Sequence, residues 1–227
     1  MNRSTFTLAL AAVLAAIAGC GPKFGVKPSA DEYRASDPGK KVQVEAYLFD
    51  AKIRRDGKPT SFRLHLYQTD TVVAMGGRGY LGKGALKGLL TTDSIEVYFP
   101  TRNEYLHEAV RDLLFTSNCT HTMPQLDFPS LLRSLPQEQD FGAGLIVRRD
   151  DSDRKRPRFI LTWTDCAWQL ELEYDHRKTG WRLREVRFED GDKVSFTAKR
   201  RAHKASTKVD RKKFDLGAEP GVTRITP

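Results

Sequence analysis

The sequence of 227 residues contains only three cysteines, so it can form no more than one intrachain disulfide. It has no internal repeat and no long low-complexity segment, which excludes an array of stacked repeats. After residue 20, no apolar run approaches the roughly 20 residues that a transmembrane helix needs. A Gly-x-Ser-x-Gly motif is also missing, so the sequence offers no nucleophile elbow and we expect no enzymatic activity.

Acidic residues are in the minority. The chain has 38 Lys and Arg residues against 29 Asp and Glu residues, a formal net charge of +9. Such a chain can bind nucleic acid or anionic lipid headgroups. The basic residues are dispersed over expected turns and strand ends, so we expect no nucleic-acid partner and favour lipid headgroups or simple solvation.

The first twenty residues have the layout of an export signal. A positive charge at Arg3 precedes an apolar run over 6–18, which is too short to remain as a membrane-spanning anchor. The segment 17–20, Ile-Ala-Gly-Cys, resembles the lipobox of bacterial lipoproteins. That resemblance implies cleavage between Gly19 and Cys20 and acylation of Cys20.

The export signal divides the chain into three expected parts. We expect a signal peptide at 1–19, a lipidated tether at 20–40 and one folded domain at 41–227. Acyl chains contribute about 0.8 kcal/mol per buried CH₂, so several of them hold a chain on a membrane. Gly21 stands where the familiar inner-membrane retention signal has Asp. The resemblance therefore implies an outer-membrane lipoprotein whose domain faces the periplasm.

Two cysteines remain once Cys20 is acylated. In an oxidising compartment, Cys119 and Cys166 most simply form a disulfide. The alternative is a metal site that adds His121. However, Cys-Thr-His is not a standard zinc spacing and a fourth ligand is not evident, so we expect no metal.

Alternating apolar and polar residues predict half-buried strands at 42–48, 62–67, 95–99 and 168–174, and we expect the first to continue to about residue 54. In the first of these segments, Glu45 and Tyr47 fall on the face opposite the aliphatic residues. The same alternation places His65 on an outward face. Further strands are expected at 71–75, 159–163, 181–188 and 194–198 and near Phe214. Short turns such as Asp56-Gly57 join successive strands, so the pairs must be antiparallel.

Helical spacing of apolar residues predicts two short helices, at 107–115 and 128–135, and Pro136 ends the second. Segment 85–90 fits either a strand or a short helix.

A glycine-rich stretch at 76–84 matches a dinucleotide fingerprint through Gly77, Gly79 and Gly82 and nearly matches a P-loop. Both motifs need a strand that leads into a helix within a parallel βαβ unit. The flanking segments alternate like strands instead. We therefore expect no nucleotide or other cofactor, and we assign the glycines to sharp bends of a curling sheet.

Two stretches resemble the LolA/LolB superfamily, particularly the LolB-like outer-membrane lipoproteins. They are 79–95 (GYLGKGALKGLLTTDSI) and 212–221 (KKFDLGAEPG). The resemblance implies a mainly β (α+β) fold, a curled antiparallel sheet or unclosed β-barrel with short helices plugging its concave face. It also implies an apolar cavity for acyl chains or an acylated lipoprotein client. One departure is that LolB has a protruding loop with an exposed apolar residue, where 68–70 here is short and polar (Gln-Thr-Asp).

Apolar residues of the expected strands and helices are the candidate lipid-binding residues. They are Phe62, Leu64, Leu66, Ile95, Val97, Phe99, Trp168, Leu170 and Leu172 on the sheet and Val110, Leu113, Leu114 and Leu131 on the helices. The same residues could fill a core completely. The sequence therefore leaves open a lipid carrier or a non-catalytic scaffold of an envelope complex.

Overall fold

The computed structural model describes residues 41–55, 57–79, 84–91, 94–109, 128–137, 145–163, 168–191, 194–216 and 223–225. The expected signal peptide, the lipidation site Cys20 and the tether lie outside these residues. So do the expected disulfide partners and the helix residues Val110, Leu113 and Leu114.

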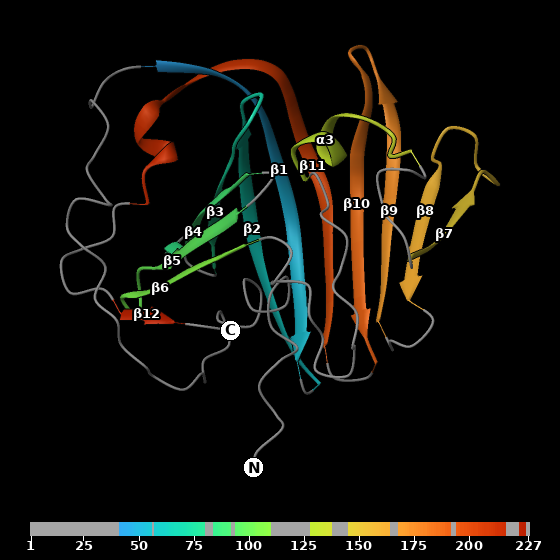
Figure 1. The fold of residues 1–227 in the computed structure, drawn as a ribbon. Helices are drawn as coiled ribbons and strands as arrows, with labels where there is room; N and C mark the ends of the chain where they lie inside the picture. The colour runs from blue at the N-terminus through green and yellow to red at the C-terminus, as the bar shows by residue number, and fades with distance from the viewer. Residues whose placement is uncertain are drawn as a thin grey trace.

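Twelve strands form one sheet in the order β12-β6-β5-β4-β3-β2-β1-β11-β10-β9-β8-β7 (Figure 1). The strands are β1 (Lys41–Arg55), β2 (Lys58–Gln68), β3 (Val73–Arg78), β4 (Gly84–Leu90), β5 (Ser94–Phe99), β6 (Glu104–Ala109), β7 (Leu145–Asp150), β8 (Arg158–Trp163), β9 (Trp168–Arg177), β10 (Gly180–Asp190), β11 (Val194–Asp210) and β12 (Thr223–Ile225). All adjacent pairs are antiparallel except β12 and β6, which are parallel. The expectation of a mainly β, antiparallel fold is confirmed.

The sheet consists of two meanders joined at its centre. One meander runs from β1 to β6 and the other from β7 to β11, and β1 pairs with β11 along almost its whole length. Buried residues from β5 and β6 in one half share a single apolar cluster with residues from β8 and β9 in the other. Strands so far apart in the sheet can share a core only if the sheet curls around it.

The turns between long strands use glycine where the backbone requires it. Gly57, in the turn from β1 to β2, has φ 76°, and Gly180, at the start of β10, has φ 105°. Other residues rarely adopt these positive values. The predicted Asp-Gly hairpin therefore lies where the sequence placed it.

One α-helix, α3 (Phe128–Arg133), lies beside β10 on the core side of the sheet (Figure 1). Pro129 is in its first turn, where the missing N–H is not needed, and Pro136 follows its end. This confirms the helix predicted at 128–135. No helix among the described residues is long and apolar enough to span a membrane.

Three local predictions were wrong or incomplete. Residues 107–109 belong to strand β6 and not to a helix, because their backbone pairs with β5. The segment near Phe214 is a 3-10 helix, η4 (Arg211–Phe214), capped by the Asp210 side chain, which accepts from the Lys212 N–H. The pattern did not predict β7 or β12. The open choice at 85–90 is resolved as strand β4.

Candidate functional site

A cavity of about 130 Å³ lies between the core face of the sheet and α3. Every residue that lines it is apolar. The lining residues are Phe49, Phe62, Leu64, Leu66, Val73, Met75, Leu86, Leu90, Leu131, Leu132, Leu170, Leu172, Leu183, Val186, Phe196 and Ala198. A space lined only by apolar side chains offers water no hydrogen-bond partner and accepts small apolar groups.

The structure brings together about half of the predicted cavity residues. Six of them line this cavity: Phe62, Leu64, Leu66, Leu131, Leu170 and Leu172. Four others are buried in the surrounding core and are not in the lining: Ile95, Val97, Phe99 and Trp168. These four belong to the same apolar cluster, so their inward orientation was predicted correctly.

Sequence reasoning missed the contribution of β3 and β4 to the lining. Met75 and Leu86 come from these two strands, and the glycines between them obscured the alternation that marks a strand. Those glycines allow close packing. A Cβ built at Gly77 would lie 2.8 Å from Cγ of Leu86, and one at Gly88 would lie 2.6 Å from Cε of Met75. The absent side chains let Leu86 and Met75 cover the cavity.

A buried polar network lies beside the cavity, and the orientation of β1 explains why it was missed. The sequence pattern placed Glu45 and Tyr47 on the solvent face, but they are only 7% and 2% exposed. β1 pairs with β2 without a register shift, so Glu45 and Tyr47 lie on the same face as the buried residues Phe49, Ala51 and Ile53. The two register shifts between β1 and β11 each place an extra residue in β11, and these bulges re-aim side chains of β11. The inward face of β1 is therefore aromatic and polar near its start, although the aliphatic residues at 42–48 suggested the opposite face.

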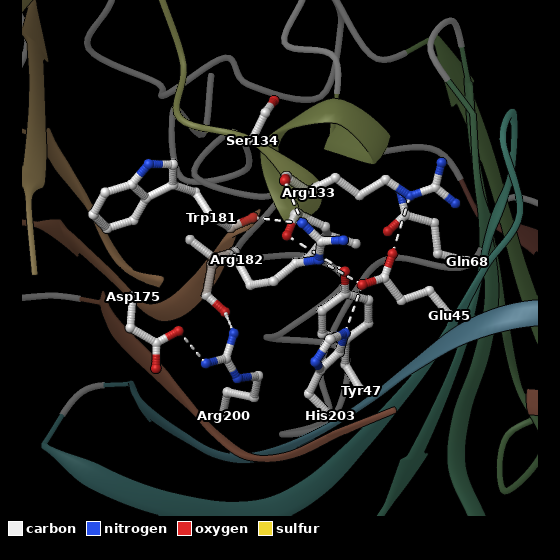
Figure 2. Close-up of polar contacts among 12 residues, drawn as sticks. Glu45, Tyr47, Gln68, Arg133, Ser134, Asp175, Trp181, Arg182, Arg200 and His203 are labelled. Atoms are coloured by element: carbon white, nitrogen blue, oxygen red, sulfur yellow. Dashed lines mark hydrogen bonds and ion pairs between the residues drawn. The ribbon is translucent and has the colours of Figure 1, made fainter. Parts of the chain in front are cut away.

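Glu45 is the centre of this network (Figure 2). Its Oε1 accepts from Nε of Arg182 at 2.5 Å and lies 2.5 Å from Nε2 of His203, while Oε2 lies 3.3 Å from Nε of Arg133. Burial alone would raise the pKa of Glu45, but the hydrogen bonds from Arg182 and His203 outweigh it and lower the pKa. The carboxylate is thus ionised and held among three basic side chains.

Tyr47 lies next to this carboxylate on the same strand. Burial raises the pKa of its hydroxyl group, and the negative charge of Glu45 raises it further. The hydroxyl therefore stays protonated and donates to the backbone oxygen of Leu132 in α3 at 3.4 Å.

The network fastens α3 to the sheet. Arg182 Nη1 donates to the Arg133 carbonyl at the end of the helix at 2.8 Å. The guanidinium group of Arg133 donates from Nη1 to Asp70 Oδ1 at 3.0 Å and from Nη2 to the Thr69 carbonyl at 2.9 Å. At the start of the helix, the amide of Gln68 donates to the carbonyl of Pro129. These contacts join α3 to β1, β2 and β10 at the edge of the cavity.

The described residues provide little for metal or nucleotide chemistry. They contain no group of three or more His, Cys, Asp and Glu side chains placed to hold a metal ion. Gly76 and Gly77 lie in β3 and Gly84 begins β4, and these strands are antiparallel neighbours. The glycine stretch is therefore not flanked by a parallel βαβ unit.

Comparison with known proteins finds only distant structural similarity. No protein-family model and no curated protein matches the sequence. A DUF1329 family protein from Desulfovibrio piger is 11% identical, with a TM-score of 0.43 over 78% of this chain and 90% of that one. A domain assigned to outer-membrane lipoprotein sorting, from Vibrio parahaemolyticus, is 9% identical, with a TM-score of 0.34 over 71% and 84%. A LolA superfamily protein from Nitrosomonas europaea is 11% identical, with a TM-score of 0.31 over 87% and 94%.

Proposed function

We propose that this chain is a lipid-anchored, LolB-like protein of the bacterial envelope that binds acyl chains, or the acyl chains of a lipoprotein, between its curled sheet and α3. The observation that carries the proposal is the wholly apolar lining of the cavity. Acylation of Cys20 would hold the domain at the outer membrane, facing the periplasm. Segment 20–40 would act as a tether that lets the domain extend away from the membrane surface.

The chemistry of the lining suits a hydrocarbon ligand. Leucine, phenylalanine, valine and methionine side chains form the walls, so a polar ligand would lose its hydrogen bonds to water without replacement. An acyl chain loses none and gains roughly 25 cal/mol per Å² of buried apolar surface. Binding would therefore select for chain length and apolar surface rather than for a particular polar group.

The volume of the cavity implies that α3 moves when a long ligand binds. About 130 Å³ accommodates a group of roughly the size of benzene. A longer acyl chain needs the space under Leu131 and Leu132, the two buried leucines of α3. The helix is only six residues long, so a bound chain would have to replace the burial of these two leucines and the polar contacts at the helix ends.

Uptake of a fluorescent fatty acid by the Cys20→Ala variant tests the proposal, together with native mass spectrometry of the purified protein. We expect stoichiometric lipid in the mass spectrum and saturable uptake. Leu64→Trp, which fills the cavity from β2, should reduce uptake at least about tenfold, since it removes the space that the ligand occupies. Ile146→Trp is the matched control, because Ile146 lies on β7 and is 52% exposed.

A second candidate is favoured by the small size of the cavity. The buried cluster extends through ten strands and α3 with little free volume, as expected of a scaffold whose core is complete. A clean protein mass without bound lipid, together with no uptake of fatty acid, would reject the carrier and support this non-catalytic scaffold.

A further inference from the structure

A second, larger hollow lies on the outer face of the sheet. Its volume is about 590 Å³, within the range of sites that bind small molecules. Strands β2, β3 and β4 form its floor and η4 forms one wall. The chain after η4 stays on this face, where Leu216 packs against Tyr98 and Tyr105. Figure 1 shows η4 and α3 on opposite sides of this part of the sheet.

The strand register explains why the hollow exists. His65 pairs with Gly76, and Gly76 pairs with Lys87, so the three residues form one row across β2, β3 and β4. Their neighbours along each strand, such as Leu64 and Leu86, face the apolar cavity. A Cβ at Gly76 would meet nothing within 4 Å, so the missing side chain leaves open space between His65 and Lys87.

Cationic side chains surround this space from several directions. Arg78, Lys87, Lys212 and Lys213 line it, against one carboxylate, Asp215. These basic side chains come from β3, β4 and η4, so their charges surround the hollow rather than following one strand.

Two features show that the positive charge here is only partly balanced. Arg63 and Arg78 lie directly opposite each other on β2 and β3, an arrangement that destabilises a sheet. Asp50 lies 3.9 Å from Arg63, but no acidic partner of Arg78 or Lys87 occurs among the described residues. The Nζ atom of Lys212 lies 3.7 Å from Oδ2 of Asp210, which is outside the row formed by His65, Gly76 and Lys87.

The pKa of His65 reflects the same positive charges. Its pKa is lowered, first by burial and then by the charges of Arg78, Lys213 and Arg63. The ammonium group of Lys213 is itself held 5.9 Å above the ring of Tyr67, also in the lining.

We infer that this hollow binds a phosphate-bearing anion. Arginine offers a planar fork of donors to phosphate oxygens, and lysines add point charges that adapt to the rest of the group. Phosphate carries up to two negative charges, which suits converging cations better than a single carboxylate does. The volume exceeds that of phosphate alone, so the ligand has room for the group that carries it. A lipid headgroup and a soluble phosphate ester share this chemistry.

Calorimetric titration of the full chain in nonionic detergent tests the site. Three probes are compared: inorganic phosphate, glycerol phosphate, and mixed micelles of phosphatidylglycerol with phosphatidylcholine micelles as the reference. Binding of phosphatidylglycerol alone identifies a lipid headgroup, and binding of the soluble probes identifies a free phosphate ester. Binding should weaken as salt is raised. If no probe binds at low ionic strength, the site does not exist.

His65 provides an independent readout. A bound anion favours the charged imidazolium, so the pKa of His65 should rise when the probe is added. The imidazole resonance that is absent in His65→Asn identifies the residue by NMR. An unchanged His65 titration under saturating probe places the ligand elsewhere and overturns the inference.

Matched variants separate local contacts from net charge. Arg78→Gln with Lys87→Gln should weaken binding at least about tenfold, as expected for two lost charge-assisted contacts. Lys52→Gln with Lys178→Gln makes the same change in net charge at exposed positions on β1 and in the β9–β10 turn, and should alter affinity less than about twofold. Equal losses in both pairs would show non-specific attraction and overturn the site.

Filling the hollow gives a steric test that leaves the charges in place. Gly76→Leu adds a side chain where the structure has free space, so the protein should fold and lose anion binding. The same variant should still take up fatty acid, while Leu64→Trp should still bind the anion. Met75 and Leu86 line both spaces, but the cationic residues line only the outer hollow, so failure of the acyl-binding proposal does not remove this site. Retention of anion binding by folded Gly76→Leu would overturn the inference.

Discussion

Arg182 donates from Nε to Oε1 of Glu45 at 2.5 Å, although 137 residues separate the two in the sequence. Both side chains are almost fully buried, at 10% and 7% exposure. The pair connects β10 to β1, and the same guanidinium group also reaches the end of α3. One arginine therefore joins both halves of the sheet to the helix that covers the cavity.

Loss of this arginine should be costly. We expect Arg182→Met to lower the free energy of unfolding by about 3 kcal/mol, because it leaves a buried carboxylate without its closest partner. His203 and Arg133 still contact Glu45, which keeps the loss at the low end of the usual range. Urea unfolding measures it. The control is Arg201→Met, whose pair with Asp50 is more than half exposed and should contribute under about 1 kcal/mol. Equal losses in the two variants would contradict the prediction.

Stability should fall in acid partly because of Glu45. Its pKa in the folded protein is below its ordinary value of 4.5, so the unfolded chain binds the proton more readily. The stabilisation by Glu45 is therefore complete above pH 4.5 and is lost as the pH falls through the folded-state pKa. Glu45→Gln should be less stable at neutral pH and should decline less steeply in acid. Urea unfolding from about pH 7 to 3 compares the two slopes. Parallel curves would show that another group dominates.

Two neighbouring glycines should respond in opposite ways to alanine. A Cβ at Gly88 would lie 2.6 Å from Met75 Cε and 3.0 Å from the Glu96 carbonyl oxygen, so Gly88→Ala should cost about 1–3 kcal/mol. A Cβ at Gly76 meets nothing within 4 Å, so Gly76→Ala should be neutral or stabilise by up to about 1 kcal/mol. Thermal unfolding of both variants tests this. A stabilising Gly88→Ala would mean that Met75 moves aside freely.

The helix over the cavity should open on its own. Leu132 is buried and lines the cavity, and α3 is a short element held mainly at its ends. Leu132→Ala should therefore accelerate hydrogen exchange in α3 while β1 and β2 keep their protection, since local opening needs less free energy than global unfolding. Leu161→Ala, in the core on β8, should instead lower global stability by about 2–5 kcal/mol. If Leu132→Ala accelerates exchange throughout the sheet, α3 is part of the global core.

Local patterns predicted most of the strands correctly. Alternation in 62–67 and 168–174 and the Asp-Gly turn depend only on neighbouring residues, so they can be recognised without a structure. Residues 107–109 show the limit of that reasoning. Their spacing is compatible with a helix, but pairing with β5 offers the backbone hydrogen bonds that a helix end would lack. The strand β12 depends equally on a distant partner, β6.

By itself, the sequence determined the antiparallel β class, the strand faces that carry leucine and phenylalanine, and the helix that ends before Pro136. The tertiary structure decided that Glu45 and Tyr47 point inward, because they share a face of β1 with Phe49, Ala51 and Ile53 and because Arg182 and His203 contact the buried carboxylate. It also decided how much of the predicted apolar face remains open as a cavity. Free volume depends on how side chains from many strands pack together, so a local sequence pattern does not predict it.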